Sequence, residues 1–182
     1  MYLLNVRTLQ LERFLGNEVP AYAILSHTWG HGEILFRDIW QRENAEIRKE
    51  GFAKVRSCCQ LANIDNLDYV WIDTCCIDSD SSAELSEAIN SMYQWYQDSK
   101  ICYAYLSDVG EGQKTFKESR WFSRGWTLQE LLASTAIRFF NHKWSEIGSK
   151  SSLHSALLSA TGVRSEHLDR PRVSSRTYSA VQ

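Results

Sequence analysis

Residues 69–73 have the sequence Tyr-Val-Trp-Ile-Asp, and residues 101–106 have the sequence Ile-Cys-Tyr-Ala-Tyr-Leu. Both segments are rich in β-branched and aromatic residues, which favour β-strands. Their apolar residues are nearly continuous rather than alternating, a pattern typical of strands that are covered on both faces. Segments 22–26 and 136–140 are similarly apolar. The sequence therefore predicts four strands.

Helical patterns lie between these strands. Apolar residues recur at helical spacing in three sets: Phe52, Val55, Cys59 and Ala62; Leu85, Ile89, Met92 and Tyr96; and Trp126, Leu128, Leu131 and Leu132. A capping box formed by Ser81 and Glu84 precedes the second set. Because parallel neighbours need crossover connections, strands that alternate with helices indicate a parallel sheet wrapped by helices. We expect an α/β fold with a flavodoxin-like parallel sheet flanked by helices.

Polar residues gather where these strands end. Residues 26–30, with the sequence Ser-His-Thr-Trp-Gly, complete the first strand and follow it, and Asp73 ends the second. In open parallel sheets, ligands bind beyond the carboxyl ends of the strands. We therefore expect a ligand site at this edge of the sheet. The candidate ligand-binding residues are Ser26, His27, Thr28, Trp29, Gly30 and Asp73.

The composition is that of a single globular domain. Hydrophobic residues make up 43% and charged residues 23% of the 182 positions, both ordinary values. The net charge of −2 provides no positive field for nucleic acid or an anionic membrane. The first residues lack the basic and apolar regions of a signal peptide, and no apolar stretch approaches a membrane span. We expect a cytoplasmic protein with no nucleic-acid partner and no membrane span.

The five cysteines form two adjacent pairs, Cys58-Cys59 and Cys75-Cys76, and a lone Cys102. Structural zinc sites use spaced pairs, and adjacent cysteines seldom bind one ion together. An odd number of cysteines in adjacent pairs is also a poor disulfide framework. We expect reduced thiols and no metal site.

Two other chemistries are weaker candidates. Ser26 and His27 suggest a nucleophile and its base, but neighbours on a strand point to opposite faces, and no Gly-x-Ser-x-Gly motif is present. Gly110 and Gly112 follow a strand but lack the third glycine of a phosphate-binding loop. A hydrogen-bonding serine and a plain turn explain these residues better.

Glu130 is a carboxylate within an otherwise apolar helical stretch, Trp-Thr-Leu-Gln-Glu-Leu at residues 126–131. Such a carboxylate must be exposed, paired or functional, because an unpaired buried charge is costly. Periodicity alone favours an exposed position.

Three segments closely resemble signature blocks of the heterokaryon incompatibility (HET) domain. They are Tyr-Ala-Ile-Leu-Ser-His-Thr-Trp-Gly at 22–30, Tyr-Val-Trp-Ile-Asp-Thr-Cys-Cys-Ile-Asp at 69–78, and Ser-Arg-Trp-Phe-Ser-Arg-Gly-Trp-Thr-Leu-Gln-Glu-Leu-Leu at 119–132. The resemblance implies a HET domain over residues 1–162, and we expect a polar, loosely ordered tail over 163–182. Since the family usually continues further, we also expect a fragment or a short member.

The HET resemblance implies a role in fungal non-self recognition, in which the domain executes the death of incompatible fused cells. It usually forms one module of a larger receptor-like protein, so other modules of that protein are expected partners. The domain is in turn similar to the TIR domain, which implies a TIR-like fold. Many TIR domains carry Trp-Cys-x-x-Glu-Leu with a glutamate that cleaves NAD. Trp126 to Leu131 resembles that motif, with Thr127 in place of cysteine.

The resemblance to TIR domains therefore implies that Glu130 is catalytic and, more loosely, that residues 26–30 face the nucleotide. Cleavage of the nicotinamide–ribose bond passes through an oxocarbenium-like state, and one carboxylate that faces the developing cation suffices. Trp29 or Trp126 would stack on a ring, and Asp73 would hold a hydroxyl or shape the loop. NAD is then the substrate, and no cofactor is expected.

Two alternatives stay open. The domain is either an enzyme of this kind, with NAD or a related nucleotide as substrate, or a non-catalytic adaptor that acts through homotypic or partner contacts. Because many TIR domains complete their sites by assembly, we expect a homo-oligomer on activation.

Overall fold

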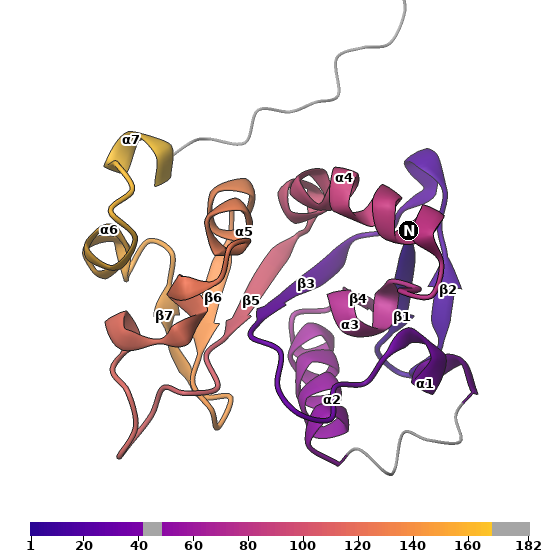
Figure 1. Ribbon diagram of the computed structural model, residues 1–182, viewed down its shortest axis with the longest axis horizontal. Helices are drawn as coiled ribbons and strands as arrows, with labels where there is room; N and C mark the ends of the chain where they lie inside the picture. The colour runs from indigo at the N-terminus through magenta and orange to yellow at the C-terminus, as the bar shows by residue number, and fades with distance from the viewer. Residues whose placement is uncertain (42–48, 169–182) are drawn as a thin grey trace, which may run out of the picture.

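A computed structural model describes residues 1–41 and 49–168. Its centre is a seven-stranded sheet with the order β2-β1-β4-β3-β5-β6-β7 (Figure 1). The strands are β1 (Tyr2–Asn5), β2 (Leu11–Arg13), β3 (Tyr22–His27), β4 (Tyr69–Trp71), β5 (Ile101–Tyr105), β6 (Ile137–Phe140) and β7 (Glu146–Ser149).

The four strands expected from the sequence form the parallel centre of the sheet. β3 pairs in parallel with β4 and with β5, and β5 pairs in parallel with β6. Counted along the chain, these four strands therefore have the order 2-1-3-4, which is the flavodoxin-like order. The expected α/β fold with a mostly parallel sheet is confirmed. The strand order reverses between β3 and β5, and ligands bind at such a switch point in open α/β sheets.

Three short antiparallel strands extend this centre and were not expected from the sequence. β1 and β2 extend it beyond β4, and β7 pairs with β6 at the opposite edge. β2 has only three residues, and none of them is fully buried. Such a segment carries too little periodic pattern to predict a strand.

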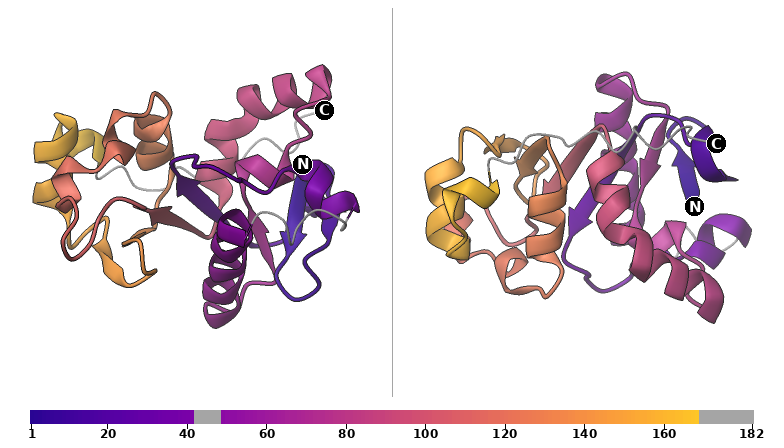
Figure 2. Two further views of the ribbon diagram at one scale, coloured as in Figure 1. Left: turned by 60° about the horizontal axis from the view of Figure 1, so that its bottom comes forward. Right: turned by 90° about the horizontal axis from the view of Figure 1, so that it is seen from above.

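Helices cover both faces of the sheet (Figures 1 and 2). α2 (Lys49–Ile64) lies on one face, and α4 (Ser82–Asp98) and α5 (Thr127–Ala133) lie together on the other. Right-handed crossovers require this arrangement, because β4 lies on one side of β3, whereas β5 and β6 lie on its other side. Ser81 caps α4 by accepting a hydrogen bond from the backbone N–H of Glu84.

Shorter elements connect these helices and strands. The remaining α-helices are α1 (Phe36–Gln41), α3 (Asp73–Cys76), α6 (His154–Thr161) and α7 (Ser165–Leu168), and the 3₁₀ turns are η1 (Gly16–Glu18), η2 (Phe116–Glu118) and η3 (Arg120–Ser123). Leu168 of α7 is buried. Residues 169–182, where most of the loosely ordered tail is expected, lie outside the described residues.

The core lies between the sheet and its helices. All six residues of β3 are buried, including the polar Ser26 and His27, as is usual for the central strand of a parallel sheet. The five cysteines are free and buried, and burial raises the pKa of the Cys59 thiol to about 12. In the part of the chain that the structure describes, no helix has the length and apolar character needed to cross a membrane.

Candidate functional site

The end of β3 divides the site into two parts. Ser26 and His27 are consecutive strand residues, so their side chains project to opposite faces of the sheet. Ser26 contacts Glu130 on α5, whereas His27 contacts Lys54 on α2. We call Ser26, Trp121, Arg124 and Glu130 the glutamate cluster.

The residues of the glutamate cluster bond to one another around a buried carboxylate. Glu130 is 2% exposed. The Arg124 guanidinium donates to both of its carboxylate oxygens, from Nη1 to Oε2 at 3.0 Å and from Nη2 to Oε1 at 2.9 Å. The Ser26 hydroxyl donates to Oε2, and the Trp121 indole N–H donates to Ser26 Oγ at 2.7 Å. A bidentate, charge-assisted pair of this kind fixes both position and orientation.

Local structure explains how residues 119–132 build this cluster. Ser119 caps η3, and η3 directs the Trp121 ring into the core, where it packs edge-to-face on Phe139 with centroids 5.7 Å apart. The Thr127 hydroxyl donates to the Trp121 carbonyl at 2.5 Å and ties α5 to that turn. Arg124, between the turn and the helix, therefore lies close to Glu130.

The charges of this pair support each other. Burial disfavours the charged form of Arg124, but the adjacent Glu130 carboxylate outweighs burial and raises the pKa of the guanidinium. Arg124 therefore stays protonated at physiological pH, and the pair contributes to the folded state only while both partners remain.

Asp73, the first residue of α3, contacts the end of β3 and the loop that follows it, on the side of the strand opposite the glutamate cluster. Its Oδ1 lies 2.9 Å from His27 Nε2, and its Oδ2 accepts the Trp29 indole N–H at 2.9 Å. Burial raises the pKa of Asp73, but its interactions with His27, the Trp29 hydrogen bond and the charge of Arg124 together outweigh burial and lower it. Asp73 thus holds the loop after β3 in place as a carboxylate.

A polar chain continues from His27 to α2. Lys54 Nζ lies 2.8 Å from His27 Nδ1 and also pairs with Glu33. An ammonium group can only donate, so Nδ1 accepts, and the ring proton belongs on Nε2, facing Asp73. Glu33 Oε1 also accepts the Gly30 backbone N–H at 2.7 Å. These bonds fix the loop after β3 against α2.

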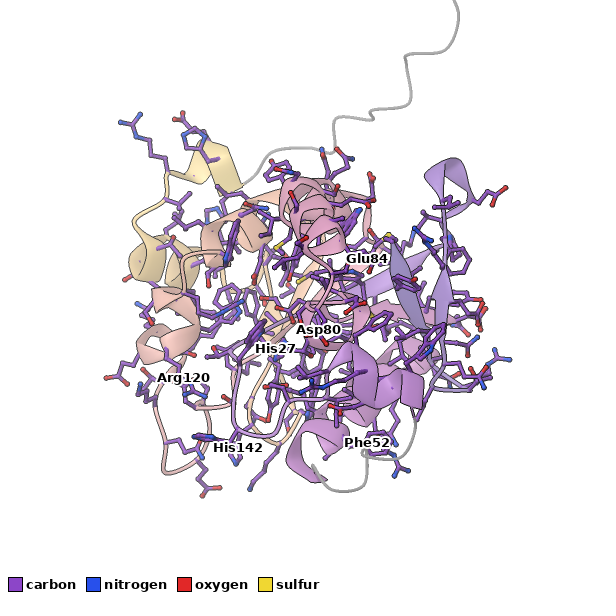
Figure 3. All side chains as sticks on the ribbon, turned by 45° about the vertical axis from the view of Figure 1, so that its right-hand side comes forward. His27, Phe52, Asp80, Glu84, Arg120 and His142 are labelled. Carbon is purple, nitrogen blue, oxygen red and sulfur yellow. The ribbon has the colours of Figure 1, made fainter. Side chains whose placement is uncertain are left out.

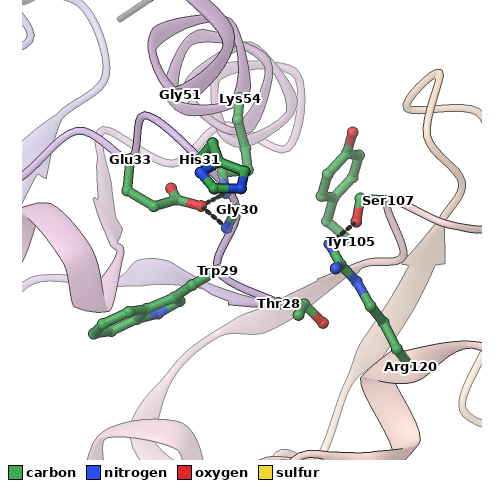
Figure 4. Close-up of a pocket in the computed structure, with 10 residues that line it drawn as sticks. All are labelled: Thr28, Trp29, Gly30, His31, Glu33, Gly51, Lys54, Tyr105, Ser107 and Arg120. Atoms are coloured by element: carbon green, nitrogen blue, oxygen red, sulfur yellow. Dashed lines mark hydrogen bonds and ion pairs between the residues drawn. The ribbon is translucent and has the colours of Figure 1, made fainter.

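A pocket of about 540 Å³ opens between this loop and the end of β5 (Figure 4). It lies at the switch point of the sheet, and we call it the switch-point pocket. Its lining residues are Thr28, Trp29, Gly30, His31, Glu33, Gly51, Lys54, Tyr105, Ser107 and Arg120. Its volume lies within the usual range for small-molecule sites.

The structure brings most of the sequence-derived candidates together, but in two groups. Ser26 lies beside Glu130, and His27 and Trp29 lie beside Asp73. The remaining candidates after β3, Thr28 and Gly30, line the switch-point pocket together with Trp29. Trp126 is separate: it precedes α5, is 45% exposed, and does not line the pocket. The functional roles of all these residues stay predictions.

Glu130 is not exposed, which corrects the expectation from periodicity alone. That expectation left out Arg124, which pairs with the carboxylate and lowers the cost of burying it. Glu130 also does not line the switch-point pocket.

Three further residues were missed from the sequence. Arg124 lies in the same block as Glu130, but a 3₁₀ turn precedes it, so no helical spacing relates the two residues. Lys54 and Arg120 reach the pocket from α2 and from η3. Arg120 and Arg124 lie in the same sequence block, 119–132, as Glu130, and this was the available signal for them; Lys54 had no such signal. Among residues 1–41 and 49–168, no group of three or more His, Cys, Asp or Glu side chains is placed to hold a metal ion.

Comparisons with known proteins identify sequences similar to this chain. The family model described as heterokaryon incompatibility protein (HET) matches residues 22–118, just over half of the chain. The chain is similar to vegetative incompatibility protein HET-E-1 of Podospora anserina, with 41% identity over 163 residues. That match covers 83% of this chain but only 12% of the relative's length. No solved structure matches the chain.

Proposed function

This chain belongs to the heterokaryon incompatibility family, and we propose that it acts in fungal incompatibility as a cell-death effector that cleaves NAD. The bond cleaved would join nicotinamide to ribose. The observation that carries this proposal is the Glu130 carboxylate, held with Ser26 at the carboxyl edge of the parallel strands, where ligands bind in open α/β sheets.

The chemistry needs few groups. The bond between the nicotinamide ring nitrogen and ribose C1′ breaks, and its electron pair leaves with neutral nicotinamide. Glu130 would face the oxocarbenium-like ribose and accept a hydrogen bond from a ribose hydroxyl. Water then adds at C1′ and releases a proton, which gives ADP-ribose. No general acid is required, because the leaving group already carries a positive charge in NAD.

The closed cluster implies that this activity is gated. Glu130 is 2% exposed and pairs with Arg124 through both oxygens, so a substrate hydroxyl reaches the carboxylate only if the cluster opens. We propose that self-association drives this change. Large apolar side chains are exposed on α4, on α5 and at the residue before α5, and α5 also carries Glu130. They are Leu85, Ile89, Tyr93, Leu128 and Trp126.

The proposal is tested by incubating the purified 182-residue chain with NAD and measuring nicotinamide and ADP-ribose. Glu130→Gln keeps the shape of the side chain and should lower turnover by about 100- to 1,000-fold. Glu87→Gln, on the exposed surface of α4, is the matched control and should keep the parental rate. Circular dichroism and thermal melts must show that each variant is folded at the assay temperature. Parental turnover by folded Glu130→Gln would rule out this role for Glu130.

Gating by self-association predicts a dependence on concentration. If the competent species is an oligomer, NAD loss per molecule rises with protein concentration by mass action. A dilution series with light scattering in parallel measures this. Constant activity per molecule in a demonstrably monomeric sample would contradict self-association and leave the cleavage proposal untouched.

A second candidate function is a non-catalytic adaptor. The observation in its favour is the complete pairing of Glu130, which is also what a structural ion pair requires. A cell-death assay with folded Glu130→Gln separates the two, because an adaptor keeps killing and an enzyme does not. A related nucleotide as substrate would show as turnover of that nucleotide, again lost in Glu130→Gln.

A further inference from the structure

Among the described residues, one cation that lines the switch-point pocket has no anionic partner. Arg120 lies on the exposed rim, and its Nη2 donates only a long bond, 3.3 Å, to Ser107 Oγ. Among the described residues, no carboxylate lies within ion-pair distance of its guanidinium; Asp108 pairs with Lys114 and accepts the backbone N–H of Arg120 instead. Most of the guanidinium donors of Arg120 are therefore available to a ligand.

The charged residues Lys54 and Glu33 also line the pocket. Lys54 pairs with Glu33 deep in the pocket, so the two charges offset each other. Arg120 thus supplies an uncompensated positive charge, next to the hydroxyls of Thr28 and Ser107, which can also donate hydrogen bonds. A guanidinium with neighbouring hydroxyls is well suited to phosphate, because its planar fork matches two phosphate oxygens.

An aromatic ring stands across the pocket from this cation. In Figure 4, Trp29 and Arg120 lie on opposite sides with Thr28 between them. The Trp29 side chain is 60% exposed, and its hydrogen bond to Asp73 fixes the orientation of the indole. A fixed, open indole face is a stacking surface for a heterocyclic base.

We infer that the switch-point pocket binds the phosphate groups of a nucleotide, with Arg120 as the phosphate ligand and Trp29 as the platform for a base. In the view of Figure 3, Arg120 lies toward one side of the molecule. The pocket volume of about 540 Å³ accommodates a ligand of this size.

The position of the pocket relative to Glu130 also indicates how NAD would lie, an inference that rests on the proposed function. Thr28 lines the pocket, and Ser26, two residues earlier, contacts Glu130. Two residues of extended chain span about 7 Å. A dinucleotide with its diphosphate on Arg120 would therefore have a ribose near the glutamate cluster, while its other half would meet Trp29.

The test is a calorimetric titration of the 182-residue chain with ADP, adenosine and inorganic pyrophosphate. Parental protein should bind ADP more tightly than adenosine, and added salt should weaken ADP binding because it screens the charges. Arg120→Gln should weaken ADP and pyrophosphate binding at least about 10-fold. Arg164→Gln, the same change at an exposed position far along the chain, should leave the affinity for ADP unchanged.

Trp29→Ala adds an independent arm. It should weaken ADP and adenosine binding but spare pyrophosphate, because only the first two carry a base. No binding of ADP, or equal affinities in Arg120→Gln and parental protein, would overturn the inference. Both positions are exposed, so folding should survive, and a thermal melt checks this.

The two proposals fail in different ways. If ADP binding depends on Arg120 but no NAD is consumed at any protein concentration, the pocket stands and NAD cleavage fails. If NAD is consumed and Arg120→Gln leaves KM unchanged, cleavage stands and the pocket assignment fails.

Discussion

The two sides of the β3 end differ in how their polar groups are satisfied. In the glutamate cluster, Arg124, Ser26 and Trp121 direct their donors to one buried carboxylate or to each other. In the switch-point pocket, the Arg120 guanidinium makes a long hydrogen bond to Ser107, and the Trp29 ring bonds to Asp73 through its N–H while its face stays exposed. Ser26 belongs to the glutamate cluster, whose polar groups bond to one another. The next residue, His27, contacts Lys54 of the switch-point pocket, where the Arg120 donors and the Trp29 face are open to a ligand.

This difference predicts that changes in the glutamate cluster affect stability, whereas changes in the switch-point pocket affect ligand binding. A closed ion pair contributes to folding, and removing one partner leaves a buried charge. An exposed cation contributes little to folding, so its removal should change only ligand affinity. If the proposed function holds, the glutamate cluster also has to open before it acts, whereas the pocket is already accessible.

The largest effect is expected for Arg124→Met. It leaves the buried Glu130 carboxylate without its bidentate partner, and the free energy of unfolding should fall by about 3–5 kcal/mol. Arg120→Met, the same change in the pocket, should cost less than about 0.5 kcal/mol. Urea denaturation measures both, and equal losses would remove the distinction between the two regions.

A double variant keeps this prediction testable if Arg124→Met does not fold. Arg124→Met with Glu130→Met replaces the pair by apolar groups and should recover most of the loss. Failure of that recovery would show that the arginine acts through packing rather than through the charge of Glu130.

Gly51→Ala is expected to have the next largest effect. Within a helix this change normally stabilises by up to about 1 kcal/mol. Here the added Cβ would stand 2.1 Å from the Gly32 carbonyl oxygen, so the loop that lines the pocket has to move. We expect a loss of about 1–3 kcal/mol together with weaker ADP binding. Gly125→Ala, where the new Cβ meets open space, is the control and should be nearly neutral.

Asp73→Asn tests the polar chain that runs from Asp73 through His27 to Lys54. The pKa of Asp73 is lowered in the folded state, so its carboxylate stabilises the fold above the unfolded pKa of about 3.9, and this contribution disappears as pH falls through the folded pKa. At pH 7 the variant should be less stable by about 1–2 kcal/mol, through weaker bonds to His27 and Trp29.

Urea titrations from pH 7 down to pH 3 measure this contribution. The difference between parental protein and Asp73→Asn should shrink below about pH 4, where the parental carboxyl also takes up a proton. A difference that stays constant with pH would mean that the charge of Asp73 contributes nothing.

The parallel centre of the fold could be predicted from the sequence because burial on both faces imposes a continuous apolar pattern, as in β4 and β5. The edge strands could not, since their pairing depends on distant contacts. In β2, for example, Glu12 accepts a hydrogen bond from Tyr69, far along the chain.

The candidate site divides in the same way. Strand ends at Ser26 and Asp73 predicted where polar groups gather, because parallel strands share one carboxyl edge. The partners of those groups were not predictable. Arg124 reaches Glu130 across an irregular turn, and Lys54 reaches His27 through helix packing that Gly51 permits. Such contacts have no fixed spacing in sequence.

The smallest effect on stability is expected for Trp29→Phe. Phenylalanine keeps a flat ring but loses the indole N–H that bonds to Asp73. Because this hydrogen bond is exposed to water, its loss should cost no more than about 0.5–1 kcal/mol in a thermal melt. ADP affinity should fall by only a few-fold and less than in Trp29→Ala, since a stacking face remains but is no longer held in place. A stability loss as large as that of Arg124→Met would show that Trp29 belongs to the closed framework and not to the open pocket, and the division between the two regions would then lie elsewhere.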